Sequence, residues 1–312
     1  MPEWLYEAGI GECRAALVTD GAIVEAIIEQ DGLRLGAVTR GKLVDLIPGG
    51  MGKLDLPGGE ALLTQVPPGV TQGASLGVEI VREAIPEPGR PKLARARATD
   101  AAPAPGRDLL ARIAASGTPV RHCHAHQPDA LEAAGWSELL DEALTGDIVF
   151  PLGALRMSPT PAMTLFDVDG PAPLEPLALA AARSVALAIR RHGIGGSIGI
   201  DFPTLAGKAP RLAVAETIDA HLPQPFERTT MNGFGFLQIV RPRPRASVPE
   251  LLAADRTGAA ARAALRRIER EPPGAPLAHR LPAPVLAWLT ARPDLLAELA
   301  RRTGVVHRLE TV

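Results

Sequence analysis

Three aspartates stand at the ends of two short apolar segments that are typical of buried strands. Asp167 and Asp169 follow one apolar run within FDVDG, residues 166–170, and Asp201 follows another within IGIDF, residues 198–202. Residues two apart on a strand face the same side, so Asp167 and Asp169 would point together, and Asp201 could meet them from a neighbouring strand. Because converging carboxylates repel one another, the pattern indicates a bound divalent cation, most plausibly Mg2+, and phosphate chemistry.

The same aspartates have a plainer interpretation, since aspartate is also favoured at helix caps and turns. In the metal-site interpretation, the cation would orient a water for in-line attack on a phosphodiester. Asp167 and Asp201 would then be required for turnover, while their removal would change folding only modestly. Retained activity in both single asparagine variants would contradict the assignment.

Two glycine-rich segments resemble nucleotide-binding motifs but stand in the wrong context. Residues 36–42 spell the first seven positions of a P-loop, yet Leu43 replaces the required Ser or Thr and a strand-like run follows. Residues 193–199 lie between a helix pattern and a strand pattern, the reverse of a dinucleotide fingerprint. We interpret both as turns.

A histidine cluster forms a second candidate metal site. His122, His124 and His126 alternate along HCHAH, so a short strand would place all three imidazoles on one face. No second ligand pair follows nearby, as a closed zinc site usually requires. Structural zinc is therefore not expected, and exposed imidazoles on a loop or strand edge are the favoured alternative.

Turn signals and periodicity divide the chain into several layers. Asp20-Gly21 predicts an opening hairpin, and short strand-like runs separated by Gly and Pro predict a small barrel at residues 37–101. From Asp147 the pattern runs strand, strand, helix, strand, helix, strand, strand, and residues 249–304 are helical in pattern. The apolar face of the first helix in this region comprises Leu174, Ala178, Ala181, Val185, Ala188 and Ile189.

Composition describes a globular chain with an uneven charge distribution. Residues are 46% hydrophobic and 22% charged, no run of eighteen apolar residues occurs, and the start lacks a signal-peptide pattern, so we expect a cytoplasmic protein without membrane contact. Cys13 and Cys123 fit a reducing compartment. Residues 241–312 carry thirteen Arg and seven acidic residues, a net of 13 − 7 = +6. This basic region suits either contact with a polyanion or a solvated helical surface.

Several separated segments resemble the ribonuclease E/G endoribonucleases, over roughly residues 10–245. RGKLVDLIPGGMGKLDLPGG is similar to the segment entering that family's S1-type barrel, and RPKLARAR to its exit strand. LGALRMSPTPAMTLFDVDG and GGSIGIDF resemble the two acidic strands, and PFERTTMNGFGFLQIVRPRPR resembles the stretch with the Phe-Gly-Leu and Arg-x-Arg signature. The order of these segments is more specific than any one of them.

The resemblance implies an α+β fold in which RNase H-like and DNase I-like layers carry an inserted S1-type (OB) barrel and a helical C-terminal tail. It implies Mg2+ at Asp167 and Asp201, with Mn2+ as a possible substitute, and Asp169 as an added ligand where the family has Asn. The implied boundaries are 1–36 and 107–146 for the RNase H-like part, 37–101 for the barrel, 147–245 for the DNase I-like catalytic part, and 246–312 for the basic tail.

The chain also departs from the family pattern. Residues 7–135 contain no Phe, Tyr or Trp, whereas an OB-type barrel normally offers aromatic rings to bases. Gly233 stands where the family carries an Arg. The region after the barrel is short for a 5′-monophosphate sensor, and the Cys pair of the family's zinc link is missing, so no zinc-linked oligomer is expected.

The first hypothesis is a Mg2+-dependent endoribonuclease that cuts single-stranded RNA and leaves 5′-phosphate and 3′-hydroxyl ends. Lys42, Lys92, Arg241 and Arg243 are the residues expected to contact RNA phosphates, with ordinary surface charge as the alternative. The second hypothesis is an RNA-binding or assembly protein that has lost catalysis. The third is a metal phosphodiesterase acting on something other than RNA.

Overall fold

A four-stranded sheet is built from the start of the chain and one strand that follows the barrel. The computed structural model describes residues 1–87, 91–272 and 274–312. Strands β1, β2 and β3 form an antiparallel meander, and β9 joins β1 in parallel, giving the order β3-β2-β1-β9. The predicted hairpin is present, with Asp20 and Gly21 both at positive φ. The strands are β1 (Glu3–Ala8), β2 (Cys13–Thr19), β3 (Ala22–Glu29) and β9 (Val120–His122).

Three helices pack beside this sheet, and all three follow the barrel in sequence. They are α1 (Leu109–Ala114), α2 (Ala130–Ala133) and α3 (Trp136–Thr145). Trp136 and Leu139 of α3 are buried in one cluster with Leu5 of β1. Residues 1–36 and 107–146 therefore form one structural unit, with the barrel inserted between its two segments.

The predicted barrel is present and closed. Its five strands have the order β4-β5-β6-β8-β7, with β6 and β8 parallel and β7 closing back onto β4. The interior is filled by aliphatic side chains such as Leu43, Leu54 and Ile80, and no aromatic residue takes part. This architecture is compatible with an inserted OB-like barrel. The strands are β4 (Val38–Ile47), β5 (Met51–Leu56), β6 (Gly59–Leu63), β7 (Ser75–Arg82) and β8 (Ala94–Ala98).

A six-stranded mixed sheet with the order β10-β11-β12-β13-β15-β14 follows the barrel unit. The sequence pattern predicts two strands before the first helix, whereas the structure has three, because β10 is a four-residue strand that ends immediately before Pro151. The elements are β10 (Asp147–Phe150), β11 (Gly153–Pro159), β12 (Thr164–Asp169), α4 (Leu174–Arg191), β13 (Gly196–Asp201), α5 (Lys208–His221), β14 (Glu227–Arg228) and β15 (Phe236–Arg241).

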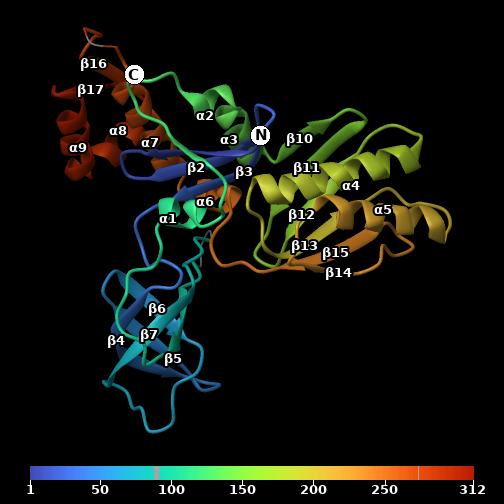
Figure 1. Ribbon diagram of the computed structural model, residues 1–312, viewed down its shortest axis with the longest axis horizontal. Helices are drawn as coiled ribbons and strands as arrows, with labels where there is room; N and C mark the ends of the chain where they lie inside the picture. Colours follow the sequence, from blue (N-terminus) through green and yellow to red (C-terminus); the bar gives the residue numbers. More distant parts are fainter. Residues whose placement is uncertain (88–90, 273) are drawn as a thin grey trace.

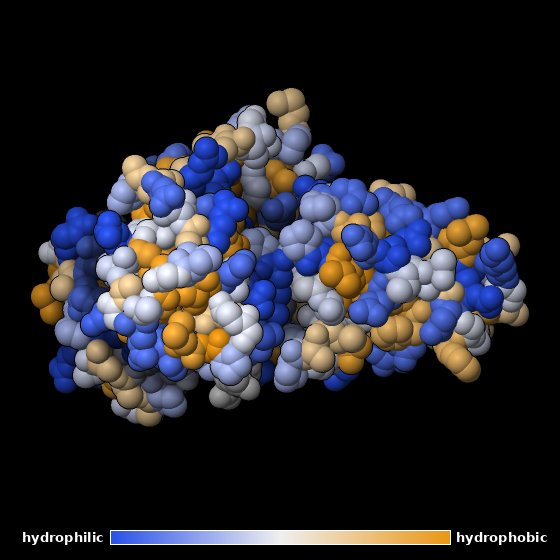
Figure 2. All heavy atoms as spheres, turned by 90° about the horizontal axis from the view of Figure 1, so that it is seen from below, coloured by the Kyte–Doolittle hydropathy of each residue, from blue (hydrophilic) through white to orange (hydrophobic). Residues whose placement is uncertain are grey.

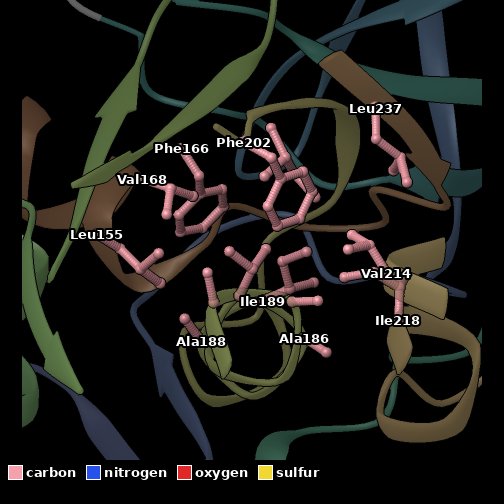
Figure 3. Close-up of a cluster of buried hydrophobic side chains, with 14 of the residues drawn as sticks. Leu155, Phe166, Val168, Ala186, Ala188, Ile189, Phe202, Val214, Ile218 and Leu237 are labelled. Atoms are coloured by element: carbon pink, nitrogen blue, oxygen red, sulfur yellow. The ribbon is translucent and has the colours of Figure 1, made fainter. Parts of the chain in front are cut away.

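Helices α4 and α5 cover one face of this sheet. Figure 3 shows Ala188 and Ile189 of α4 facing Leu155, Phe166 and Val168 of the sheet, all of them buried. Five of the six residues predicted for the apolar face of α4 are fully buried; Leu174 is the exception at 42% exposure, because it lies in the first turn, and Leu177 is buried instead. The helices leave the other face of the sheet to solvent.

His192, at the end of α4, connects two of these units. Its buried imidazole lies 3.1 Å from a carboxylate oxygen of Glu142 on α3, and its carbonyl accepts a hydrogen bond from Val248. Burial lowers the pKa of His192 below its ordinary value, although the contact with Glu142 acts in the opposite direction. The imidazole is therefore held neutral between the sheets.

The C-terminal region packs against the opening meander. The predicted helical pattern of residues 249–304 is present in helices α6 to α9, but the described residues also form a two-stranded parallel sheet, whose strand β16 lies within that range and was not predicted. In Figure 1 the region lies at the far side of the first sheet from the β10–β15 sheet, and the barrel projects away from both. The elements are α6 (Val248–Ala254), α7 (Arg256–Glu269), β16 (Ala278–Leu281), α8 (Ala283–Thr290), α9 (Pro293–Thr303) and β17 (Arg308–Thr311).

Part of the basic charge of this region is paired with acidic side chains of the first unit. Arg266 and Arg262 of α7 lie against Glu12, and Arg270 pairs with Glu7 and with Asp129. The side chains of Arg262 and Arg266 are only 9% exposed. These three arginines are therefore neither part of a solvated helical surface nor free to contact a polyanion. They bind acidic side chains on and next to strand β1 and at the start of α2.

Within the described ranges, every helix is too short or too polar to cross a membrane.

Candidate functional site

Two of the predicted aspartates lie side by side on the open face of the six-stranded sheet. Asp167 and Asp201 are register partners in the parallel pair β12–β13, so their Cα atoms are about 4.8 Å apart. The preceding pair, Phe166 and Ile200, is buried under the helices, while both aspartates are exposed. Alternation along the strands thus places both carboxylates on the face opposite α4 and α5.

Asp169 extends the same face by one step along β12. Asp169 pairs in register with Ala154 of β11, and its side chain is exposed. It has no register partner on β13, because that strand ends at Asp201, opposite Asp167. Arg156 is the register neighbour of Asp167 but forms its ion pair with Asp147, at 3.1 Å. Within the described part of the chain, the three predicted carboxylates have no ion pair, so their negative charges are open to a ligand.

The donor set suits a hard cation held partly by other ligands. No group of three or more His, Cys, Asp or Glu side chains in the described residues is arranged to hold a metal ion by itself. Mg2+ commonly uses one or two protein carboxylates and completes its octahedron with waters and substrate phosphates. Asp167 and Asp201 fit that pattern, and Mn2+ accepts the same oxygen ligands. Asp169 lies on the correct face but not at a third adjacent register position.

The loop between β14 and β15 lies against the end of β13. The amide of Phe202, which follows Asp201, donates a 3.1 Å hydrogen bond to the carbonyl of Gly235. Phe236 is the register partner of Asp201 on the neighbouring antiparallel strand. A Cβ placed on Gly199 would lie 2.7 Å from the Phe236 ring, so this ring covers Gly199 on the carboxylate face. The sequence indicated this loop only through its Phe-Gly signature.

Gly233, at the position where the family resemblance places an Arg, leaves open space in this loop. A Cβ built on Gly233 meets no atom within 4 Å, and its backbone lies outside the positive-φ region. Gly233 therefore supplies no cation to this loop, and the basic residue that adjoins the carboxylates in the register is Arg156 of β11.

The four predicted phosphate-binding residues are dispersed rather than gathered at the carboxylates. Lys42 is exposed on β4 of the barrel. Lys92 pairs with Glu87, which also accepts a 3.1 Å hydrogen bond from Arg243. Lys92 and Arg243 thus share the carboxylate of Glu87, whereas Lys42 is exposed.

Arg241 ends β15 and is half-buried. Its guanidinium donates to the carbonyl of Ile194 at 3.4 Å, and desolvation by burial lowers its pKa below the ordinary arginine value. Arg243 lies two residues on and additionally pairs with Glu250 of α6. The Arg-x-Arg segment therefore holds the sheet to the barrel and to the C-terminal region in this conformation.

A cavity of about 920 Å3 lies between the barrel, the turn that joins β11 to β12, and helix α6. Figure 2, which views the molecule from the barrel side, shows hydrophilic residues gathered where the two lobes meet. Arg95 is exposed in this cavity, and the turn between β11 and β12 forms its opposite wall. Its charged lining residues are Lys53, Glu60, Arg82, Glu87, Lys92, Arg95 and Glu250.

The histidine cluster forms a stack at the edge of the first sheet. The ring centroids of His122 and His124 are 6.5 Å apart and those of His124 and His126 are 5.5 Å apart, with nearly parallel planes. Tyr6 packs edge-on against His122 at 5.5 Å. These rings line a separate cavity of about 1290 Å3 beside α7. All three imidazoles are exposed at the end of β9 and in the turn that follows it.

The two glycine-rich segments, residues 36–42 and 193–199, run into strands, as their sequence indicates. Residues 38–42 of the first segment already belong to strand β4, and residues 196–199 of the second, which follows helix α4, belong to strand β13. Neither segment opens a helix, so neither presents a helix N-terminus to a phosphate.

A scan against protein-family models and a search of curated proteins both return no match for this chain.

Proposed function

We propose that this protein is a Mg2+-dependent endoribonuclease of the ribonuclease E/G type, which cuts single-stranded RNA and leaves 5′-phosphate and 3′-hydroxyl ends. The observation that carries the proposal is the register pairing of Asp167 with Asp201. Two carboxylates that form no ion pair with the described residues lie on neighbouring strands of an open sheet face, where an extended polymer can reach them. Stability alone does not favour that arrangement, because like charges directly opposite each other on a sheet repel.

The topology supports the same family assignment. An inserted five-stranded barrel with parallel β6 and β8 interrupts a sheet of order β3-β2-β1-β9, in which β9 runs parallel to β1. We take the first sheet with α1–α3 as the RNase H-like part, the barrel as the S1-type insertion, and the β10–β15 sheet with α4 and α5 as the DNase I-like catalytic part.

Each side chain has a limited task in this mechanism. Asp167 and Asp201 would hold the cation, and Asp169 would add negative charge on the same face. A Mg2+ ion bound there would supply a positioned water and offset the negative charge on the phosphate oxygens. Gly233 stands where an arginine is expected to contact the scissile phosphate. We therefore expect slow cleavage, with the RNA held in part by the exposed cations of the barrel.

The deciding experiment uses labelled single-stranded RNA with Mg2+ and then with EDTA. Asp201→Asn should abolish metal-dependent cuts, while Asp147→Asn should retain them. Asp147 is the matched control because it is also an exposed aspartate on this sheet, separated from Asp167 by β11. Equal activity of the two variants and the parent chain would refute the site.

A second candidate function is favoured by one specific observation. The barrel interior and surface contain no aromatic residue, and the loop beside Asp201 carries Gly233 in place of a cation. Both features suit an RNA-binding or assembly protein that has lost catalysis. Tight RNA binding without cuts in Mg2+ or Mn2+ would favour this candidate over the enzyme.

A further inference from the structure

One aromatic side chain differs from all others in its exposure. The chain has six Phe, three Trp and one Tyr, and most of these side chains are buried. Phe234 is 86% exposed. The half-buried aromatic residues have neighbours: Tyr6 packs on His122, and the Arg292 guanidinium lies 3.7 Å from the ring centroid of Trp288. The exposure of Phe234 has no comparable explanation in packing.

The backbone that carries Phe234 is held by several hydrogen bonds. The side-chain oxygen of Asn232 accepts from the amides of Phe234 at 2.9 Å and Phe236 at 3.0 Å. The Thr204 hydroxyl donates to the carbonyl of Phe234 at 3.3 Å. The loop is thus tied both within itself and to the segment after β13. An exposed ring on a fixed backbone loses little conformational freedom when it binds a flat ligand.

The backbone of Phe234 lies close to the end of β13 that carries Asp201. Gly235, the next residue, accepts the hydrogen bond from the amide of Phe202, which directly follows Asp201. Phe236 lies opposite Asp201 in the register, with its ring over Gly199 on the open face. Two aromatic residues, Phe234 at the end of the loop and Phe236 at the start of β15, therefore lie beside the end of β13 that carries Asp201, Phe236 half-buried and Phe234 exposed.

We propose that Phe234, with Phe236 beside it, forms a nucleobase-stacking subsite adjacent to the cleavage site. The inference rests on the proposed function and specifies how that site holds its substrate. Single-stranded nucleic acids bind by stacking successive bases on aromatic rings, and such stacking tolerates any base because every base has a π-face. The subsite supplies at the cleavage site the aromatic platform that the barrel lacks, and it predicts little base preference at this nucleotide.

The test measures RNA binding in EDTA, so that cleavage does not contribute. A fluorescein-labelled single-stranded RNA is titrated with the parent chain, Phe234→Ala and Phe234→Tyr, and the Kd is read from anisotropy. Loss of the ring should weaken binding about 5- to 150-fold, whereas Phe234→Tyr, which keeps the ring, should bind like the parent. Circular dichroism confirms that the variants are folded.

A set of RNAs with one abasic ribose at successive positions identifies the contact. At one position, base removal should weaken binding by the parent chain but should not further weaken binding by Phe234→Ala, and with Mg2+ the cut should fall next to that position. Parent-like binding by Phe234→Ala, or a full abasic effect in that variant at every position, would overturn the subsite.

The outcomes also separate the subsite from the proposed activity. RNA cuts that depend on Asp201, together with unchanged affinity in Phe234→Ala, would remove the subsite and leave the nuclease. Base-dependent affinity at Phe234 without any metal-dependent cut would keep the stacking site and remove the catalytic proposal.

Discussion

Replacement of Gly235 by alanine should disrupt the loop beside Asp201, and replacement of Gly233 by alanine should not. Gly235 has φ +100°, and a Cβ at this position would lie 2.1 Å from the carbonyl oxygen of Phe202. The strained backbone costs about 1–3 kcal/mol. Relief of the overlap must also break the hydrogen bond from the Phe202 amide to Gly235, which costs about 0.5–1.5 kcal/mol.

The expected loss in the free energy of unfolding is about 2–4 kcal/mol for Gly235→Ala. Gly233→Ala is the matched control in the same loop, because its Cβ meets nothing within 4 Å and its φ is not positive. That variant should be neutral, or more stable by about 0.4–1 kcal/mol, since alanine restricts the unfolded chain. Urea titration followed by circular dichroism measures both. Equal stability of the two variants would refute the conformation described for this loop.

Three further perturbations test other parts of the structure. Gly233→Arg should fit without strain and, under the proposed function, should increase RNA affinity and cleavage by adding a cation beside the carboxylates; unchanged kinetics would show that this position does not face substrate. Arg266→Ala should cost about 3–5 kcal/mol in urea titration because it leaves the buried carboxylate of Glu12 without its closest partner, and Arg266→Met combined with Glu12→Leu should recover most of that loss. His192→Gln should flatten the decline of stability between pH 7.5 and 5.5: the folded-state pKa is depressed by burial, so the stabilisation is present above the ordinary value of about 6.5 and is lost as pH falls below it. A parent chain with the same slope as His192→Gln would contradict the buried neutral imidazole.

The sequence predicted those elements whose conformation is specified by residues adjacent in the chain. Asp20-Gly21 specifies a tight turn by itself, and the glycine-separated strands at residues 37–101 specify a barrel because each is short and alternates. The meeting of Asp167 with Asp201 also agrees with the sequence pattern, since each aspartate follows the apolar residues of its strand. The shared face of Asp167 and Asp169 was predicted as well, but not the lack of a β13 register partner for Asp169, because that depends on how far β13 extends.

Electrostatic pairing was the part that sequence could not supply. The i, i+4 row of arginines on α7 suits solvent, RNA or an internal partner equally well, and only the tertiary fold brings Glu12 and Glu7 to it. The same applies to Arg243, which fits a phosphate contact until Glu87 and Glu250 are seen to occupy it. Charge counts over a segment therefore predict attraction, but not whether the partner lies in the same chain.

This internal neutralisation bears on where RNA can bind. With Arg262, Arg266 and Arg270 paired to acidic side chains, Arg95 of the barrel is, among the described residues, the exposed cation of the cavity that faces the turn between β11 and β12. Asp167 lies on strand β12, which follows that turn, and Asp201 lies on the neighbouring strand β13. A strand of RNA that crosses from the barrel to the open sheet face would meet cations first, then the carboxylates, then the ring of Phe234. Affinity should consequently show a shallow salt dependence, since few phosphates contact cations and part of the binding comes from stacking.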